Sequence, residues 1–253
     1  MNITIAGYGF VGKAHEAILK QHGHTVSIVD PKLGPNRVYD STSNGVIICV
    51  ATPSDVDGSC YMENVSDVVR DTPTNVPVLI KSTISLEGWR GLIKAFPEHN
   101  ITFSPEFLRA ETAEQDFKNT KFLYFSISGD QEFWSGLFSE IFYNLKYYYE
   151  DTEALILSKY FRNSFLATKV SFFNQIYDLC DKTGIRYEDV ARLVGQDDRI
   201  GMSHTGVTPD RGFGGHCFPK DTQAIVSTAD RFDVELDLIE SSITYNKRIR
   251  KQV

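Results

Sequence analysis

Ten consecutive residues, 212–221, form the part of the sequence richest in reactive groups: Gly-Phe-Gly-Gly-His-Cys-Phe-Pro-Lys-Asp. Their glycines permit a tight loop in which backbone approaches a ligand closely. Cys217 directly precedes a predicted helix whose first turn contains Pro219. A thiol at a helix N-terminus, with His216 and Lys220 beside it, is in surroundings that lower a thiol pKa. A purely structural cysteine would not need neighbouring glycines, so Cys217 is predicted to be a nucleophile.

Two further polar side chains lie four residues apart on a predicted long helix. Lys159 and Asn163 therefore project from one face, where an ammonium and an amide could bind an oxyanion or a sugar oxygen. The alternative for this pair alone is a solvated helix face. Asp221, after the cysteine, could hold a proton, orient Lys220 or complement the helix dipole.

Polar residues also follow several predicted strands. Glu106, in Ser104-Pro105-Glu106-Phe107-Leu108-Arg109, comes after the predicted strand 101–103. Thr52-Pro53 and Lys81-Ser82-Thr83 follow two other strands in the same way. Because parallel sheets bind ligands at the carboxyl ends of their strands, these residues are candidates for a site.

The N-terminus carries a G-x-G-x-x-G pattern, Gly7-Tyr8-Gly9-Phe10-Val11-Gly12, between a predicted strand and a predicted helix. In that context the pattern indicates a dinucleotide site, with the pyrophosphate at the helix N-terminus. Asp30 ends the second strand and could accept hydrogen bonds from both hydroxyls of the adenine ribose, which favours NAD over NADP. Lys32, two residues later, slightly weakens this preference for NAD. The alternative is a plain strand–turn–helix unit that binds nothing.

The elements needed to position these residues alternate along the first half of the chain. Apolar runs typical of buried parallel strands occur at 3–6, 25–29, 46–50, 78–81, 101–103 and 122–127. Helical segments separate them, for example 11–21 and 86–96, and this alternation predicts a doubly wound α/β sheet. Beyond about residue 150 the pattern is helical, with predicted helices at 153–182, 188–194, 220–230 and 234–251. We therefore predict a Rossmann-type cofactor-binding domain over 1–150 and a helical, dimerising domain over 151–253.

The composition narrows the class of protein. The 253 residues carry a formal net charge of −7, which argues against nucleic acid as a partner. No apolar run could span a membrane, and no secretory leader is recognisable. The four cysteines form neither a disulfide framework nor, with the histidines, a metal-ligand grouping, so we expect no metal and a reducing, cytoplasmic location. Apolar surface on the long helix predicts a homodimer.

Together these residues resemble the UDP-glucose/GDP-mannose dehydrogenase family. The resemblance is carried in chain order by residues 7–12, Thr52-Pro53, Ser82-Thr83, residues 105–108, Lys159 with Asn163, Asp198-Arg199-Ile200-Gly201 and residues 214–221. It implies an NAD-dependent oxidation of the primary alcohol of a nucleotide sugar to an acid in two hydride transfers.

The resemblance also implies a role for each residue. Cys217 would attack the intermediate aldehyde, giving a thiohemiacetal and then a thioester. Lys159 and Asn163 would stabilise the oxyanion, Asp221 would assist proton transfer, and Glu106, with Thr83, would help water hydrolyse the thioester. The implied cofactor-binding residues are 7–12, Asp30, Lys32, Thr52, Pro53 and Thr83. The implied substrate-binding residues are Glu106, Phe107, Leu108, Arg109, Lys159, Asn163, Arg199, Phe213, Gly214 and Gly215.

Family members continue into another α/β domain that holds the nucleotide, and this sequence is expected to lack it. Binding energy from a remote nucleotide normally helps drive the chemistry, so weaker substrate binding would follow. One alternative is therefore a catalytically weak or inactive partner that binds NAD and dimerises with a longer dehydrogenase. Another is a single-step dehydrogenase for a simple hydroxy acid, which would not need Cys217.

Overall fold

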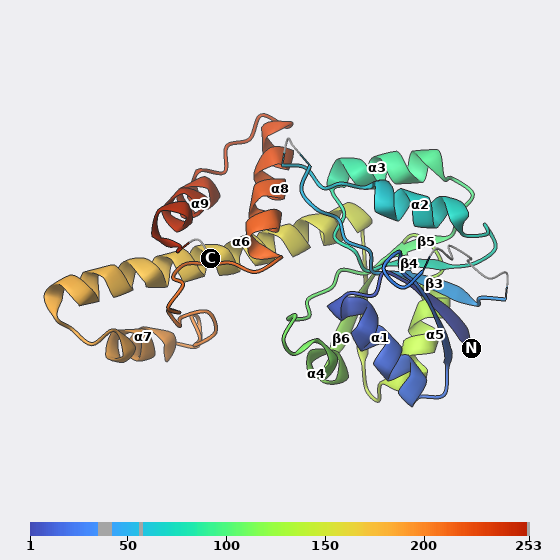
Figure 1. Ribbon diagram of the computed structural model, residues 1–253, viewed down its shortest axis with the longest axis horizontal. Helices are drawn as coiled ribbons and strands as arrows, with labels where there is room; N and C mark the ends of the chain where they lie inside the picture. The colour runs from blue at the N-terminus through green and yellow to red at the C-terminus, as the bar shows by residue number, and fades with distance from the viewer. Residues whose placement is uncertain (35–41, 56–57, 252–253) are drawn as a thin grey trace. The chain divides into compact units, whose positions relative to one another are not determined.

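The structure is a computed structural model that describes residues 1–34, 42–55 and 58–251 (Figure 1). The chain divides into two compact units. The N-terminal unit comprises Met1–Asp55 and Cys60–Lys159, and the helical unit comprises Val56–Ser59 and Tyr160–Val253.

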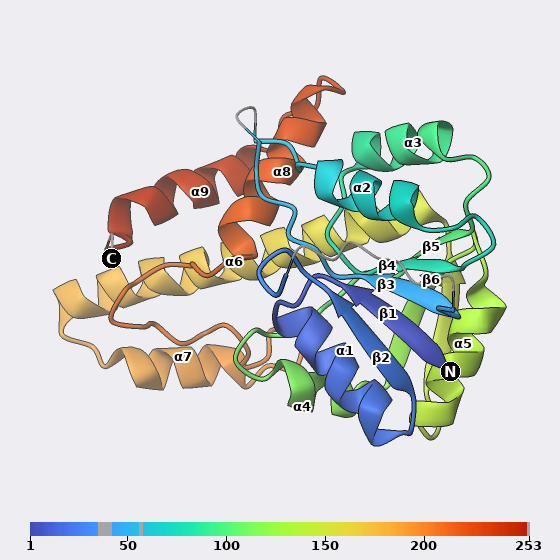
Figure 2. The same cartoon turned by 45° about the vertical axis from the view of Figure 1, so that its right-hand side comes forward.

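A parallel sheet forms the centre of the N-terminal unit. Within the described residues it has five strands in the order β2-β1-β3-β4-β5, and every pairing is parallel (Figure 2). The strands are β1 (Asn2–Ala6), β2 (Thr25–Val29), β3 (Gly45–Ile48), β4 (Val78–Ile80) and β5 (Ile101–Phe103). The predicted doubly wound α/β class is confirmed. Strand β1 lies inside the sheet, β2 lies on one side of it, and β3, β4 and β5 follow in order on the other side.

Helices cover both faces of this sheet. Helices α2 (Glu63–Asp71) and α3 (Leu86–Ala95) lie on one face, and α1 (Phe10–Gln21), α4 (Ala113–Lys118) and α5 (Gln131–Ile141) lie on the other (Figure 1). The central strands are buried on both sides, which explains why their sequences are apolar without alternation. Trp134, Phe138 and Phe125 are at most 1% exposed and form part of the main hydrophobic core.

Two more strands pair with each other, β6 (Phe122–Ser126) and β7 (Lys146–Glu150), again in parallel. Strand β7 was absent from the predicted strands. Its sequence, Lys-Tyr-Tyr-Tyr-Glu, is mostly exposed and lacks the aliphatic run that marked the others. Aromatic residues stabilise strands through cross-strand packing, a contact that sequence periodicity does not show.

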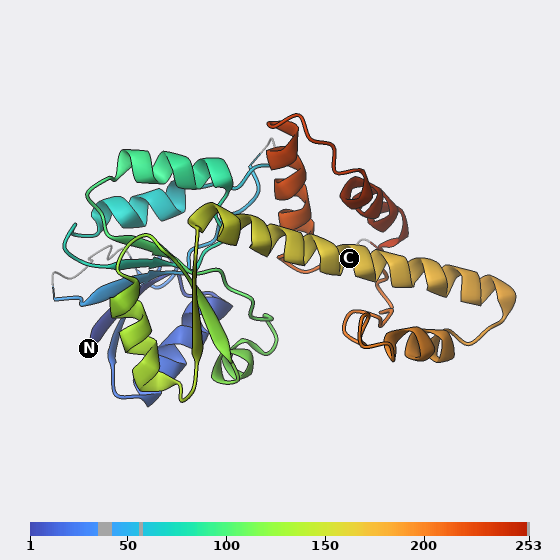
Figure 3. The same ribbon diagram turned by 180° about the vertical axis from the view of Figure 1, so that it is seen from behind.

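The helical unit is organised along α6 (Thr152–Thr183), whose first eight residues belong to the N-terminal unit (Figure 3). It continues with α7 (Tyr187–Gly195), α8 (Phe218–Asp230) and α9 (Asp237–Ile249), close to the predicted helices. Phe173 and Cys180 of α6 pack with Tyr187 and Ala191 of α7 in a small core. Among the described residues, no helix is both long enough and apolar enough to cross a bilayer.

Candidate functional site

The glycine-rich turn between β1 and α1 is tightly packed at Gly7 and Gly12 but open at Gly9. Gly7 adopts a φ of +93°, and a Cβ there would lie 2.5 Å from the carbonyl oxygen of Cys49. A Cβ on Gly12 would lie 2.1 Å from the Gly7 oxygen, so the helix rests directly on the turn. At Gly9, by contrast, no described atom lies within 4 Å of the Cβ position. The backbone is therefore open at Gly9, where a pyrophosphate would approach.

The surroundings of this turn fit a dinucleotide. No side chain among the described residues caps the N-terminus of α1, so its first N–H groups can bind an anion. Asp30, at the end of β2, accepts the Tyr8 N–H at 2.7 Å and the Lys32 N–H at 2.9 Å. These bonds fix the carboxylate while each oxygen keeps a lone pair for a ribose hydroxyl.

The remaining residues of the pattern are held by α1. The Tyr8 hydroxyl donates to Glu16, and the Lys13 ammonium lies 5.4 Å from the centre of the Tyr8 ring. Phe10 begins the helix and packs against the main core, and the Val11 carbonyl accepts a hydrogen bond from His15. The turn is thus held both by its glycines and by side chains of the helix that follows.

The ends of β3 and β4 approach each other through backbone contacts. The Ser82 hydroxyl donates to the Val50 carbonyl at 2.8 Å, and the Cys60 thiol lies 3.3 Å from the Thr83 carbonyl oxygen. Thr52 is buried, and the Pro53 carbonyl accepts the Tyr61 N–H at 2.9 Å. These contacts fix Thr52, Pro53 and Thr83 at the carboxyl edge of the sheet, where ligands of this class of sheet bind.

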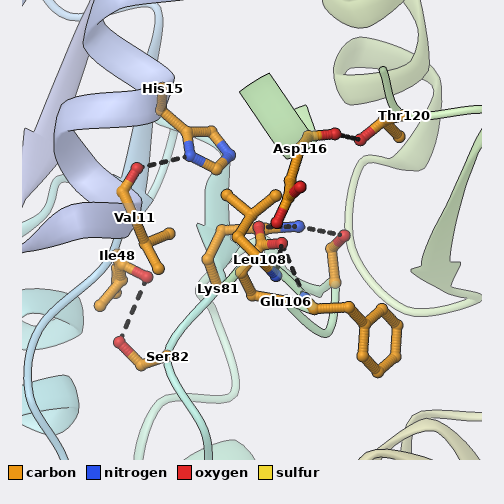
Figure 4. Close-up of polar contacts among 11 residues, drawn as sticks. Val11, His15, Ile48, Lys81, Ser82, Glu106, Leu108, Asp116 and Thr120 are labelled. Atoms are coloured by element: carbon orange, nitrogen blue, oxygen red, sulfur yellow. Dashed lines mark hydrogen bonds and ion pairs between the residues drawn. The ribbon is translucent and has the colours of Figure 1, made fainter. Parts of the chain in front are cut away.

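A buried ion pair lies at the same edge (Figure 4). The Lys81 Nζ, just past β4, is 3.2 Å from Oε2 of Glu106, which follows β5, and 3.0 Å from the Ser104 hydroxyl. The other carboxylate oxygen of Glu106 accepts the N–H groups of Phe107 at 2.7 Å and Leu108 at 3.2 Å. Both oxygens of Glu106 are therefore held in place.

Charges around Glu106 keep it ionised. Burial alone would raise its pKa, but Lys81, His15, Lys159 and the Phe107 N–H outweigh that effect, so the pKa lies below its ordinary value. Burial lowers the pKa of His15 to about 4, so this histidine is neutral near pH 7. At neutral pH the edge of the sheet thus presents a carboxylate able to accept a proton.

The residues after Glu106 have different surroundings. Leu108 packs against the main core, and the Phe107 ring meets Tyr124 edge-on at 6.4 Å between centroids. Arg109 is largely exposed and forms a bidentate pair with Asp116, at 2.6 and 2.9 Å. That pair stabilises the loop after β5. It also engages the Arg109 guanidinium, which was predicted to bind substrate.

In the helical unit, Cys217 is the N-cap of α8 and its side chain is exposed. Pro219 is in the first turn, as predicted. The Cys217 carbonyl accepts the Asp221 N–H at 2.8 Å, so the two residues are one helical turn apart. The thiol therefore lies at the positive end of the α8 dipole.

Asp221 connects several of the predicted residues. Its carboxylate is 1% exposed and accepts the Asn163 amide at 2.6 Å and the Lys220 ammonium at 2.6 Å. Asp221 therefore contacts Lys220, as one of the roles considered for it requires, and also the Asn163 amide. Lys159, four residues before Asn163 on α6, is 6% exposed, so the solvated helix face weighed for this pair does not describe Lys159.

Two asparagines fix the loop that precedes Cys217. Asn246 of α9 accepts the Phe213 N–H at 2.7 Å and donates to the Phe213 carbonyl at 3.0 Å. Asn174 of α6 accepts the Gly212 N–H at 3.1 Å and the Arg211 Nε at 2.9 Å. Asn246 thus satisfies two buried backbone groups and Asn174 one partly buried N–H, so the loop has a defined position on these helices.

The other predicted substrate-binding residues of the helical unit differ in how open their surroundings are. Gly215 has a φ of +76° and no described atom within 4 Å of its Cβ position, whereas a Cβ on Gly214 would meet the Arg250 guanidinium. Arg199 pairs with Asp197 at 2.9 Å, and its side chain is 89% exposed. Phe213 is 4% exposed, and Asn246 bonds both its N–H and its carbonyl, so this residue anchors the loop.

Sequence reasoning missed two of the residues that position this machinery, His15 and Asn174, and it named Lys81 only as a polar residue after a strand, without a role. His15 occupies the buried stripe of α1, and a polar residue at an apolar position was the available signal. Lys81 likewise ends an otherwise apolar strand. Asn174 carried no signal, because an asparagine inside a long helix is ordinary until its tertiary partner is known.

The parallel sheet, the glycine-rich turn and the helical unit define a Rossmann-type dehydrogenase. Residues 153–248 match the central domain of the UDP-glucose/GDP-mannose dehydrogenase family. The chain is 31% identical to the UDP-glucose 6-dehydrogenase of Rhizobium meliloti (strain 1021) over 97% of its own length and 67% of that protein. It is 30% identical to the Bacillus subtilis (strain 168) enzyme of the same name, over 97% of the chain and 66% of that protein.

The fold agrees with these matches. The structure of a UDP-glucose dehydrogenase from Pyrobaculum islandicum superposes with a TM-score of 0.82 at 24% identity, covering 98% of this chain and 68% of that one. The chain therefore belongs to the UDP-glucose/GDP-mannose dehydrogenase family, a family of oxidoreductases. It spans about two thirds of the length of the curated relatives it matches.

Proposed function

We propose that this protein oxidises the primary alcohol of a nucleotide sugar such as UDP-glucose to the carboxylic acid, using NAD as the oxidant. The observation that carries the proposal is the exposed Cys217 thiol at the N-terminus of α8, one turn from a buried Asp221. A one-step alcohol dehydrogenase does not need such a nucleophile. A route from alcohol to acid can use one, because a thiolate adds to the aldehyde and the tetrahedral adduct can then lose a second hydride.

In this proposal Cys217 changes its bonding twice. Its thiolate adds to the carbon of the intermediate aldehyde, and the adduct becomes a thioester when that carbon is oxidised again. Lys159 and Asn163 donate hydrogen bonds to the oxygen that bears negative charge in the adduct. Asp221 holds the Asn163 amide in position through the 2.6 Å contact, and its own carboxylate serves in proton transfer.

Hydrolysis of the thioester is assigned to Glu106, with Thr83. Water adds to the acyl carbon, the Glu106 carboxylate accepts a proton from that water, and the carbon–sulfur bond breaks to return the Cys217 thiolate. A carboxylate that is ionised at neutral pH suits this role, and the pairing of Glu106 with Lys81 at 3.2 Å supports it.

Residues of the N-terminal unit would hold the cofactor. The open backbone at Gly9 and the N-terminus of α1 fit a pyrophosphate, and Asp30 fits an unphosphorylated ribose, hence NAD. When bound, this group supplies a hydride acceptor for each of the two oxidations. Thr52, Pro53 and Thr83, at the ends of β3 and β4, are the other residues expected to contact it.

The experiment measures NADH formed per sugar consumed by the chain, with UDP-glucose and GDP-mannose as substrates. Two NADH per sugar are expected for the wild-type protein, and mass spectrometry should find an acyl adduct on Cys217 in the Glu106→Gln variant. Cys217→Ser should lose the four-electron reaction, since a hydroxyl is far less nucleophilic than a thiolate. Cys180→Ser, a buried cysteine of the same unit, is the matched control and should retain turnover.

One NADH per sugar, with full activity in Cys217→Ser, would refute the cysteine route. A folded protein that binds NAD but turns over neither sugar would instead support a non-catalytic partner of a longer dehydrogenase.

We also propose that the protein is a homodimer formed through α6. Phe161, Phe165, Phe172 and Leu179 are 44–68% exposed and recur at intervals of four and seven residues, so they share one face of the helix. An apolar stripe of this length is typical of a surface that a partner covers, and a second copy offers the same stripe.

Light scattering after size exclusion tests this assignment. The wild type should show twice the chain mass of 28.6 kDa, and the double variant Phe165→Asp/Phe172→Asp should show a single chain. Ile93→Asp, an exposed apolar position on α3, is the control and should remain dimeric. A wild-type protein that elutes as a monomer at micromolar concentration would overturn the dimer.

A further inference from the structure

A lysine with almost no exposure is a costly feature of the N-terminal unit. The Lys81 side chain is 1% exposed, and its ammonium contacts the Glu106 carboxylate at 3.2 Å and the Ser104 hydroxyl at 3.0 Å. Burying an ammonium is unfavourable unless a counter-charge and hydrogen bonds compensate. An apolar side chain would suit this position at the end of an apolar strand better, so stability alone does not account for Lys81.

The geometry around Glu106 suggests what the lysine does. Backbone N–H groups of Phe107 and Leu108 hold one carboxylate oxygen, and Lys81 holds the other. Figure 4 shows the Lys81 and Glu106 side chains facing each other beneath His15. The carboxylate is thus fixed in one orientation and balanced by a cation that solvent barely reaches.

We propose that Lys81 is a positioning residue that holds Glu106 ionised and oriented, so that the carboxylate can accept the proton of water during thioester hydrolysis. This inference rests on the proposed function, in which Glu106 assists that water. Lys81 itself contacts neither the thioester nor the cofactor in this assignment. It acts through Glu106 alone.

The other groups near Glu106 do not replace Lys81. His15, on α1, acts on Glu106 as a cation only in acid, because burial lowers its pKa to about 4; at working pH it is neutral. Cys49, after β3, is also neutral, because burial raises the pKa of its thiol. Lys159, on α6, carries the remaining positive charge that acts on the carboxylate, with a smaller effect than Lys81. Removing Lys81 therefore leaves Glu106 buried with one weaker cation and two backbone donors.

The first measurement needs no substrate. Infrared difference spectra of wild type minus Glu106→Gln, recorded across pH, follow the carboxyl band of Glu106 alone. Wild-type Glu106 should titrate below 4.5, and in Lys81→Met its pKa should rise by roughly one to three units. A shift below 0.3 units would overturn the proposal, as would a wild-type Glu106 that titrates above 4.5.

Two further variants separate charge from packing. Ser104→Ala removes a neutral contact to Lys81 but keeps the ion pair, so Glu106 should titrate as in the wild type. Lys81→Met/Glu106→Gln removes both charges, and it should be at least as stable as Lys81→Met, because no unpaired carboxylate remains buried. If Lys81→Met does not fold but the double variant does, the unpaired Glu106 carboxylate, rather than lost packing, prevents folding. The wild-type titration then still shows whether Glu106 is held ionised.

The kinetic measurement tests the role in hydrolysis. In single-turnover experiments, the acid limb of thioester hydrolysis in Lys81→Met should move to higher pH by the same one to three units, with the rate recovering at high pH. A merely structural lysine would lower the rate at every pH without moving the limb, and that result would overturn the positioning role. If no sugar is turned over, the proposed function fails, while the substrate-free titration still reports on the pair.

Discussion

The amide of Asn246 offers the sharpest test of how the loop before Cys217 is held. Asn246→Ala removes two hydrogen bonds, one to each backbone group of Phe213, at 2.7 and 3.0 Å. Both residues are at most 7% exposed, so water cannot readily replace the lost partners. Leaving a buried polar group unsatisfied costs about 1–3 kcal/mol, and losses at two groups of one residue are not fully additive, so together they should destabilise the closed loop by about 2–4 kcal/mol.

Hydrogen exchange measures this loss directly. Because each 1.4 kcal/mol is a factor of ten, the protection of the Phe213 amide should fall about 30- to 700-fold in Asn246→Ala. Asn246→Asp keeps the acceptor for the Phe213 N–H but loses the donor, and should give an intermediate loss. Asn64→Ala, which removes one exposed hydrogen bond to the Ala51 carbonyl, is the control and should leave Phe213 unaffected.

A folded Asn246→Ala protein whose Phe213 protection stays within threefold of the wild type would refute the reasoning. The loop would then be held by its other contacts, which include those of Asn174 with Arg211 and Gly212 and the bond from Arg250 to the Arg211 carbonyl.

Three further predictions follow from burial and packing. Gly9→Ala should leave thermal stability unchanged yet weaken NAD binding measured by calorimetry, whereas Gly12→Ala, whose methyl would meet backbone at 2.1 Å, should cost about 1–3 kcal/mol of stability in urea unfolding. The folded pKa of His15 is about 4 against an ordinary 6.5, so the unfolded state binds more protons between these values and stability should fall by up to about 3 kcal/mol as pH drops from 6.5 to 4. His15→Gln should lack that loss, and an equal slope in both proteins would contradict the assignment. Phe138→Ala, fully buried, should cost about 3–5 kcal/mol, and Tyr143→Ala, 95% exposed, should change stability by less than about 0.5 kcal/mol; similar losses at the two positions would contradict the core described above.

Much of the fold could be predicted because its signals are local. The apolar strand at residues 46–48 and the glycines at 7, 9 and 12 follow from backbone geometry and burial, which a short window of sequence records. Strand β7 lacked such a signal, since its tyrosines could equally cover a surface loop. Its assignment depends on pairing with β6, a contact made across some twenty residues of chain.

The candidate site was predictable only where residue type limits chemistry. Cys217 could be named as a candidate because a thiol beside glycines at a helix start has few other uses. Lys81 and His15 could not be assigned, because their roles depend on the dielectric surroundings and on which charges face them. Asn246 shows the same limit: an amide is an ordinary helix residue until the structure brings buried backbone groups to it.

The two units hold their reactive groups by different physical means, with a consequence for pH dependence. Glu106 is held by charge, so its orientation and ionisation respond to pH and to the loss of Lys81. The loop before Cys217 is held at Phe213 by an amide, which does not titrate. It is also held at Arg211 by an ion pair with Asp178, whose pKa lies below its ordinary value because the effect of burial is outweighed by hydrogen bonds from Tyr245 and Arg211, so this pair stays charged above pH 5. Loop opening at Phe213 should therefore be insensitive to pH between about 5 and 9. Any pH dependence of Cys217 alkylation in that range then reports the thiol and its charged neighbours, because the geometry of its support is constant.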